Sequence, residues 1–290
     1  MNAIWFAAVA AMTWGAADYL GGASRGRTPV FVVVAATELF GLGLLVPVLV
    51  ARGVPPPANP RLLLAAVAGV GATIELSLIY LALSRGEGFV TAAVGALGAA
   101  AAATVGLIAG DPVDALVAAG LACALLGGGA SAWTPGGGSR GSGPLHSTAV
   151  NSAALCVGAA AGLAIAFISF RAAGRVDPYW ATAVEHLSTA LCAILIELAV
   201  GRRPRRQRLP RLAQVPGLAL AGLTGVAGDL AYAIASQHGT LSVVSAVSSL
   251  YPITTIGLGM AIQRQRPTRV QVAGITVALV GAVVLGAATG

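Results

Sequence analysis

The sequence predicts an all-α integral membrane protein with ten transmembrane helices, arranged as two inverted five-helix repeats. Three observations carry this prediction. Of the 290 residues, 57% are hydrophobic and 9% are charged, whereas soluble domains average about 25% charged residues. Apolar runs long enough to cross a bilayer as a helix, about 20 residues each, recur from end to end. Finally, the second half of the sequence repeats features of the first.

The apolar runs are continuous rather than short and alternating, which favours helices over a membrane β-barrel. Short polar, glycine-rich or proline-containing segments separate them. The helices are therefore expected at residues 3–22, 29–50, 62–84, 88–109, 113–132, 149–170, 179–200, 213–236, 240–262 and 269–288.

The segment 133–147 is rich in Gly, Ser and Pro and has no apolar period. Such a composition is typical of a flexible linker. The predicted organisation is therefore a five-helix repeat over residues 1–132, a linker over 133–147 and a second five-helix repeat over 148–290.

Two pairs of segments show the repetition. Tyr80 to Ser84 corresponds to Tyr232 to Ser236, and the polar hinge at Asp111 corresponds to the hinge at Gln265. Because each half has an odd number of helices, the second half would enter the membrane with the opposite orientation. Inverted repeats of this kind recur in secondary transporters, where exchange of conformation between the halves gives alternating access.

A polar hinge followed nine residues later by a glycine and a helix of small residues resembles the EamA family of the drug/metabolite transporter superfamily. The resemblance covers nearly the whole chain. One difference is that the family usually has Glu at the hinge, whereas this chain has Asp111 in the first half and Gln265 in the second. It implies a multi-pass transporter with a central cavity lined by helices one, three, four, six, eight and nine. The matching residues are Trp14, Gly15, Asp111, Gly120, Gln265, Gly274 and the segment Leu241 to Pro252.

The formal net charge is +7, but the Arg residues fall in the short gaps between apolar runs. This distribution indicates membrane topology rather than nucleic-acid binding. The most basic segment, 201–211, is interpreted as a determinant of topology, with contact to anionic lipid as the alternative. The residues that would make such a lipid contact are Arg202, Arg203, Arg205, Arg206 and Arg208.

The orientation follows from where the 17 basic residues lie. Most of them fall in the loops after helices one, three, five, seven and nine. Positive residues in short loops stay in the cytoplasm, so both termini are expected outside the plasma membrane. Similar transporters are generally drawn with both termini in the cytoplasm, and the charge distribution disagrees with that picture.

Ionisable side chains within membrane spans are costly, so they are candidates for a functional site. We add to these candidates the aromatic and proline residues that share a helix face with an ionisable residue or that match the family. The candidates for a substrate or proton pathway are Trp14, Asp18, Glu38, Glu75, Tyr80, Glu185, His186, Asp229, Tyr232, Tyr251 and Pro252.

Glu75 is expected near the middle of helix three, and Glu38 and Glu185 near the middle of helices two and seven. Carboxylates and imidazoles at such depth can bind and release protons. The alternative for each is a structural hydrogen bond to a neighbouring helix.

An aromatic residue lies one helical turn from an acid at Trp14 and Asp18 and again at Tyr232 and Asp229. This pairing suits an amine or an amphipathic organic solute, or else an aromatic packed beside a snorkelling acid. Pro252 would release backbone groups that a substrate could use.

These features favour a secondary-active transporter of a small organic solute, such as a metabolite, an amino acid or a drug. We expect an exporter that works by alternating access, with proton coupling as an option, and not an enzyme. The alternative is a membrane-embedded enzyme acting on a lipid or lipid-linked substrate, for which Asp111 and Asp114 are the paired carboxylates. Neither a nucleotide-binding loop nor metal-ligand spacing among the histidines is visible, so no cofactor or metal is expected.

Overall fold

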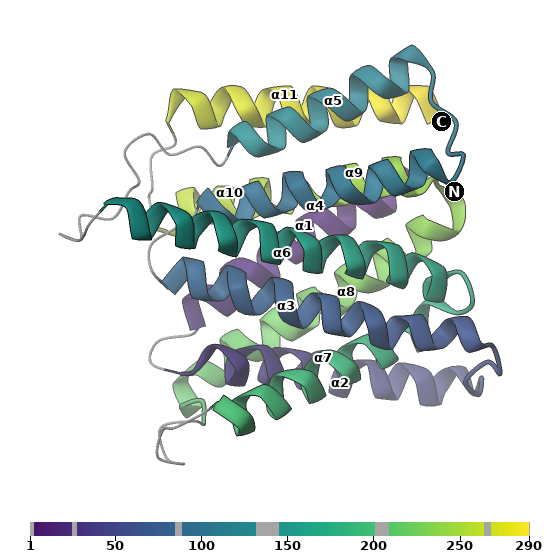
Figure 1. Ribbon diagram of the computed structural model, residues 1–290. Coiled ribbons are helices and arrows are strands. Elements are labelled where there is room, and N and C mark those ends of the chain that lie inside the picture. The colour runs from purple at the N-terminus through teal and green to yellow at the C-terminus, as the bar shows by residue number, and fades with distance from the viewer. Residues whose placement is uncertain are drawn as a thin grey trace.

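The computed structural model describes residues 3–24, 28–84, 89–131, 145–200, 209–263 and 268–289, and these fold almost entirely into helices that lie side by side (Figure 1). Short 3-10 turns, Pro60–Leu63 and Leu212–Gln214, precede α3 and α8. The helices are α1 (Ala3–Ser24), α2 (Val30–Arg52), α3 (Leu64–Ser84), α4 (Phe89–Ile108), α5 (Ala115–Ser131), α6 (Leu145–Gly174), α7 (Pro178–Val200), α8 (Val215–His238), α9 (Leu241–Ser248), α10 (Tyr251–Gln263) and α11 (Arg269–Thr289).

Seven segments of the described chain are long and apolar enough to cross a membrane. Shorter apolar helices lie at Leu97–Ile108, Ala115–Ala130 and Arg269–Leu285. The outer surface of the bundle carries many exposed apolar side chains, among them Leu126, Leu195 and Val283. A surface of this kind needs a hydrocarbon environment, so the chain is a multi-pass membrane protein.

Small residues allow the main helix pairs to approach closely. The most extensive contacts join α5 to α11, α3 to α6 and α1 to α8. A Cβ atom added at Gly71 of α3 or at Gly162 of α6 would lie closer than 3 Å to the backbone of the partner helix. The same holds for Gly127 of α5 and Gly281 of α11. The small residues therefore set the distance between helices, as in other small-residue interfaces within membranes.

The expected ninth span, residues 240–262, is broken into α9 and α10 at Ser249 and Leu250. Pro252 lies in the first turn of α10, where its missing N–H leaves no helical hydrogen bond unmade. Close to the break, the Ser249 hydroxyl donates to the Ala246 carbonyl at 2.8 Å. The ninth span is still one apolar segment long enough to cross a membrane, but the expectation of one continuous helix was wrong at this point. Pro252 has no N–H to continue the hydrogen bonds of α9, and its ring would clash with the preceding turn.

The end of α2 and the start of α7 are tied together at one face of the bundle. Arg52 forms an ion pair with Asp177 at 2.9 Å, and its guanidinium lies 4.0 Å from the centre of the Tyr179 ring. Asp177 also accepts hydrogen bonds from the backbone N–H groups of Tyr179 and Trp180, both at 2.9 Å. Burial alone would raise the pKa of the Asp177 carboxyl, but the hydrogen bonds from Arg52 and Trp180 outweigh it and hold that pKa below its usual value.

Candidate functional site

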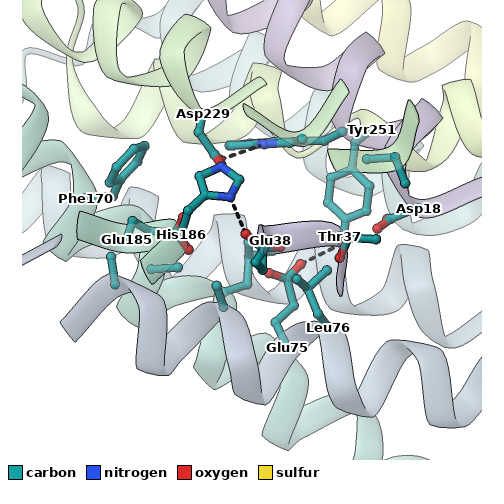
Figure 2. Close-up of a pocket in the computed structure, with 18 of the residues that line it drawn as sticks. Asp18, Thr37, Glu38, Glu75, Leu76, Phe170, Glu185, His186, Asp229 and Tyr251 are labelled. Atoms are coloured by element: carbon teal, nitrogen blue, oxygen red, sulfur yellow. Dashed lines mark hydrogen bonds and ion pairs between the residues drawn. The ribbon is translucent and has the colours of Figure 1, made fainter. Parts of the chain in front are cut away.

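A cavity lies inside the bundle, among residues from both halves of the chain (Figure 2). Its acids, aromatic rings and small residues come from α1, α2, α3, α6, α7, α8 and α10. The lining residues are Trp14, Ala17, Asp18, Thr37, Glu38, Ala68, Ala72, Glu75, Leu76, Tyr80, Leu163, Ala166, Phe167, Phe170, Glu185, His186, Ala221, Gly222, Gly225, Asp229 and Tyr251.

The helices around the cavity differ partly from those that the family resemblance implied. Helices α1, α3, α6 and α8 line it as expected, and the broken ninth span contributes Tyr251. However, α2 and α7 also line the cavity, whereas α4 supplies none of the lining residues in the described part of the chain. The reason is that α2 and α7 bring Glu38, Glu185 and His186 to the interior, where membrane-embedded ionisable groups belong.

His186 of α7 lies between two carboxylates, an arrangement called the His186 clamp below. Its Nδ1 is 2.5 Å from Oε2 of Glu38 in α2, and its Nε2 is 2.9 Å from Oδ2 of Asp229 in α8 (Figure 2). Neither ring nitrogen makes a well-formed hydrogen bond to these carboxylates, and the two contacts are ion pairs when His186 is protonated. A doubly protonated imidazole presents N–H groups on both sides, so this geometry suits the cationic form of His186.

Glu75 of α3 is hydrogen-bonded to the broken span, α9–α10. The Tyr251 hydroxyl donates to Oε1 of Glu75 at 3.3 Å, and both side chains are buried. This hydrogen bond links the middle of α3 to the first residue of α10. A change in the charge of Glu75 would therefore be felt directly at the break between α9 and α10.

Glu185 precedes His186 on α7 and has an oxygen without a partner. The Thr189 hydroxyl donates to Oε1 at 2.8 Å. The other oxygen, Oε2, is buried and makes no hydrogen bond. A buried carboxylate oxygen is costly to leave unsatisfied, so this atom marks a place where a proton or a ligand would be stabilised.

An aromatic cluster flanks the cavity. The indole N–H of Trp14 donates to Oδ1 of Asp229 at 2.9 Å, and the ring centroids of Trp14 and Phe167 are 5.8 Å apart. Tyr232 stacks on Phe167 and Phe170 behind these rings, with centroid distances of 5.0 and 6.1 Å. Its hydroxyl donates to the Phe167 carbonyl at 3.0 Å, so Tyr232 supports the cavity wall and is not itself among the lining residues.

The cavity brings together every residue that the sequence singled out except Tyr232 and Pro252. Glu38 and Glu185, expected near the middle of helices two and seven, both line it. Sequence reasoning missed Thr37, Phe167 and Phe170, among others, because an apolar or hydroxyl side chain within an apolar helix carries no signal of its own. Arg202, Arg203, Arg205, Arg206 and Arg208 lie outside the described residues.

Three of the lining side chains could also be considered as metal ligands. Glu38, Glu185 and His186 each offer one ligand atom, and these atoms lie within 4.8 Å of one another. Spacing in the sequence gave no sign of this grouping, because Glu38 comes from a distant helix. A metal would require a neutral imidazole nitrogen, whereas both nitrogens of His186 already face carboxylates.

Comparison with known proteins found a matching family for the second half of the chain. Residues 150–287 match the model of the EamA-like transporter family. The second half of the chain is therefore similar to the EamA-like transporter family. EamA-like proteins are membrane transporters of small solutes, so this is the function class that the comparison supports.

A solved structure, titled as a crystal structure of a protein, resembles this chain over nearly its whole length. The TM-score is 0.77 at 18% sequence identity, over 97% of this chain and 97% of that chain. At this identity the likeness shows the fold alone. No curated protein matches the sequence.

Proposed function

We propose that the protein is a secondary-active exporter of a small organic solute in the plasma membrane, working by alternating access. The observation that carries this proposal is the cavity between the two halves, in which acids from α1, α2, α3, α7 and α8 surround a common space. Intramembrane acids facing a cavity are a recurring feature of substrate and proton pathways.

The packing of the helices supports two inverted five-helix repeats as the architecture. If α1 to α5 correspond in order to α6, α7, α8, the α9–α10 pair and α11, exchanging the halves should reproduce the helix contacts. Helix α5 packs on its counterpart α11, and α2 on its counterpart α7. The α3–α6 contact exchanges with α1–α8, and α2–α8 exchanges with α3–α7, and all of these contacts are made.

The broken span adds to the case for transport. Discontinuous helices near the middle of the membrane are typical of transporter substrate sites, and Tyr251 at the start of α10 both lines the cavity and binds Glu75. We propose that Glu75 carries a coupling proton, and that its protonation alters the hold of α3 on α10.

The enzyme alternative gains no support from its candidate residues. Oδ2 of Asp111 accepts hydrogen bonds from the backbone N–H and the hydroxyl of Ser242, each at 2.9 Å. Oδ1 of Asp114 accepts from the backbone N–H of Val117 at 2.8 Å, at the start of α5. Both acids therefore have structural partners, and neither is among the residues that line the cavity.

Uptake into proteoliposomes tests the proposal. The purified protein would be reconstituted and offered a panel of labelled metabolites, amino acids and drugs, with and without an imposed proton gradient. We expect saturable flux of at least one solute that a proton gradient accelerates. Empty liposomes provide the control, and a protein that moves none of the panel in either condition would contradict the proposal.

A further inference from the structure

We infer that the cavity binds an organic cation: an amine with an aromatic or apolar body and no carboxylate of its own. The inference deepens the proposed function and rests on it for the transport of this ligand. Binding itself can be measured without transport.

The charge of the lining residues is strongly one-sided. Five carboxylates face the cavity, from Asp18, Glu38, Glu75, Glu185 and Asp229, and His186 is the one lining residue that can carry a positive charge. The clamp commits His186 to Glu38 and Asp229. Asp18, Glu75 and Glu185 form no ion pair with another described residue.

These remaining acids have unmet capacity to accept hydrogen bonds. Oε2 of Glu185 is buried without a partner, and the Glu185 side chain belongs to a residue that is only 6% exposed. Asp18 is 5% exposed, points toward the same space as Glu75 (Figure 2) and makes no hydrogen bond or ion pair with another described residue. An ammonium group carries several donors and no acceptor, so it would satisfy these oxygens and neutralise their charge together.

The remaining wall suits the body of such a ligand. Trp14, Phe167 and Phe170 contribute aromatic rings, and Leu76, Leu163 and several alanines also line the cavity. Aromatic faces attract cations and also pack against apolar groups. A wall that contains both carboxylates and aromatic rings fits a molecule with a charged group and an apolar body.

The same lining disfavours a zwitterion or an anion. A ligand carboxylate needs donors, and the donors seen at the wall are already engaged. The Trp14 indole donates to Asp229, the Thr37 hydroxyl to the carbonyls of Val33 and Val34, and the Tyr251 hydroxyl to Glu75. A second carboxylate would also meet the charge of the acids at short range.

Three ligands that share one phenyl ring and a short chain test the charge preference. Phenethylamine is a cation, L-phenylalanine a zwitterion and 3-phenylpropionate an anion at neutral pH. Equilibrium dialysis of the labelled compounds against the full-length protein in lipid nanodiscs would measure binding. We expect phenethylamine to bind about tenfold or more tightly than the other two, the ratio for one unmatched charged contact. Equal binding of L-phenylalanine, or binding of none of the three, would overturn the inference.

Two variants locate the amine. Asp18→Asn and Glu185→Gln should each weaken phenethylamine binding by about tenfold, since each removes a charge but keeps the size of the side chain. Glu197→Gln is the matched control on α7, away from the cavity, and should leave binding unchanged. Unchanged amine affinity in a folded Asp18→Asn/Glu185→Gln double variant would show that the amine binds elsewhere. It would contradict the assignment of Asp18 and Glu185 as its ligands. The comparison of the three ligands uses the wild-type protein and does not depend on the folding of any variant.

Flux measurements separate failure of this inference from failure of the proposed function. Transport of L-phenylalanine or another carboxylate-bearing solute, without binding of phenethylamine, would support the proposed transporter function. It would reject the inference that the cavity binds an organic cation. Binding of phenethylamine without flux of any solute would support the organic-cation site and reject the proposed transporter function.

Discussion

Nδ1 of His186 in α7 lies 2.5 Å from Oε2 of Glu38 in α2, so an ion pair crosses from the EamA-like half of the chain to the other half. Both residues are buried. Removal of one member of a buried pair leaves the other charge uncompensated, which destabilises more than the pair itself stabilises. The consequences for stability can be measured directly.

A double-mutant cycle with Glu38→Gln and His186→Gln should show coupling between the two positions. We expect an interaction free energy of about 1–3 kcal/mol in unfolding, in the range for residues that share an ion-pair network. Unfolding in mixed micelles with increasing denaturing detergent provides the measurement. A cycle built on Glu197→Gln and His186→Gln is the control and should be additive. Additivity in the Glu38 cycle would mean that the short contact contributes no coupling.

Glu75→Gln should reduce proton-driven flux far more than it reduces folding. The variant loses the ionisable group but keeps an oxygen that can accept the Tyr251 hydrogen bond, so unfolding should change by less than about 1 kcal/mol. Flux in proteoliposomes over a range of pH gives the readout. Tyr251→Phe is the companion variant, since it removes the hydrogen bond and retains the acid. Normal transport with unchanged pH dependence in Glu75→Gln would make Glu75 structural.

Asp177 should make stability depend on pH in the acid range. Because its folded pKa is held below the ordinary value of 3.8, the ion pair with Arg52 stabilises the protein fully above that value. The contribution is lost as the pH falls through the lower, folded pKa. Asp177→Asn keeps a capping side chain but removes the charge, and should cost about 0.5–1 kcal/mol at neutral pH for a partly exposed pair.

Thermal unfolding midpoints of the wild type and Asp177→Asn would be compared from neutral pH downward. The gap between the two midpoints should stay constant to about the ordinary pKa of 3.8 and close below it. Asp177→Ala also removes the cap of α7 and should lose about 1 kcal/mol more at every pH. A gap that widens in acid would contradict the assigned direction of the pKa.

Gly41→Ala should destabilise the contact between α2 and α8. A Cβ at this position would lie 2.9 Å from the Gly222 carbonyl oxygen and 2.9 Å from Cε1 of His186. The helices cannot separate without disturbing the His186 clamp, so we expect a loss of about 1–3 kcal/mol. Gly43→Ala, two residues further along α2, meets nothing within 4 Å and is the matched control. Equal midpoints for the two variants would show that α2 and α8 pack less tightly than described.

The orientation inferred from the Arg distribution places the loop at 201–211 in the cytoplasm. A single cysteine at Gln207, in a background without Cys123, Cys156 and Cys192, should resist impermeant thiol reagents in intact cells. It should react after the membrane is permeabilised, which serves as the internal control. Labelling of intact cells would put this loop outside and both termini inside.

The location of the helices could be predicted from the sequence because lipid imposes it. Each apolar run must satisfy its backbone internally and therefore forms a helix. The same constraint made it possible to predict that Asp18, Glu75 and Asp229 face the protein interior, and all three line the cavity. Here the chemical type of the residue was enough to predict its surroundings.

The packing of the helices determines which residues come together at the cavity, and the sequence alone did not predict this. The His186 clamp joins residues from three helices, and no spacing along the chain relates Glu38 to Asp229. Phe167 and Phe170 are indistinguishable by type from the lipid-facing apolar residues around them. The role of α2 and α7 in the cavity wall likewise depends on how the helices pack, which local sequence does not specify.

The excess of acids around the cavity has an electrical consequence. A monovalent cation leaving a cell that is negative inside moves against about 2.3 kcal/mol for each 100 mV of membrane potential. Asp18, Glu75 and Glu185 lie outside the His186 clamp, so an exporter of the proposed kind would have more than one acid in its cavity to carry returning protons. Return of one proton for each expelled cation moves no net charge, whereas return of two moves one positive charge inward and lets the voltage itself drive export.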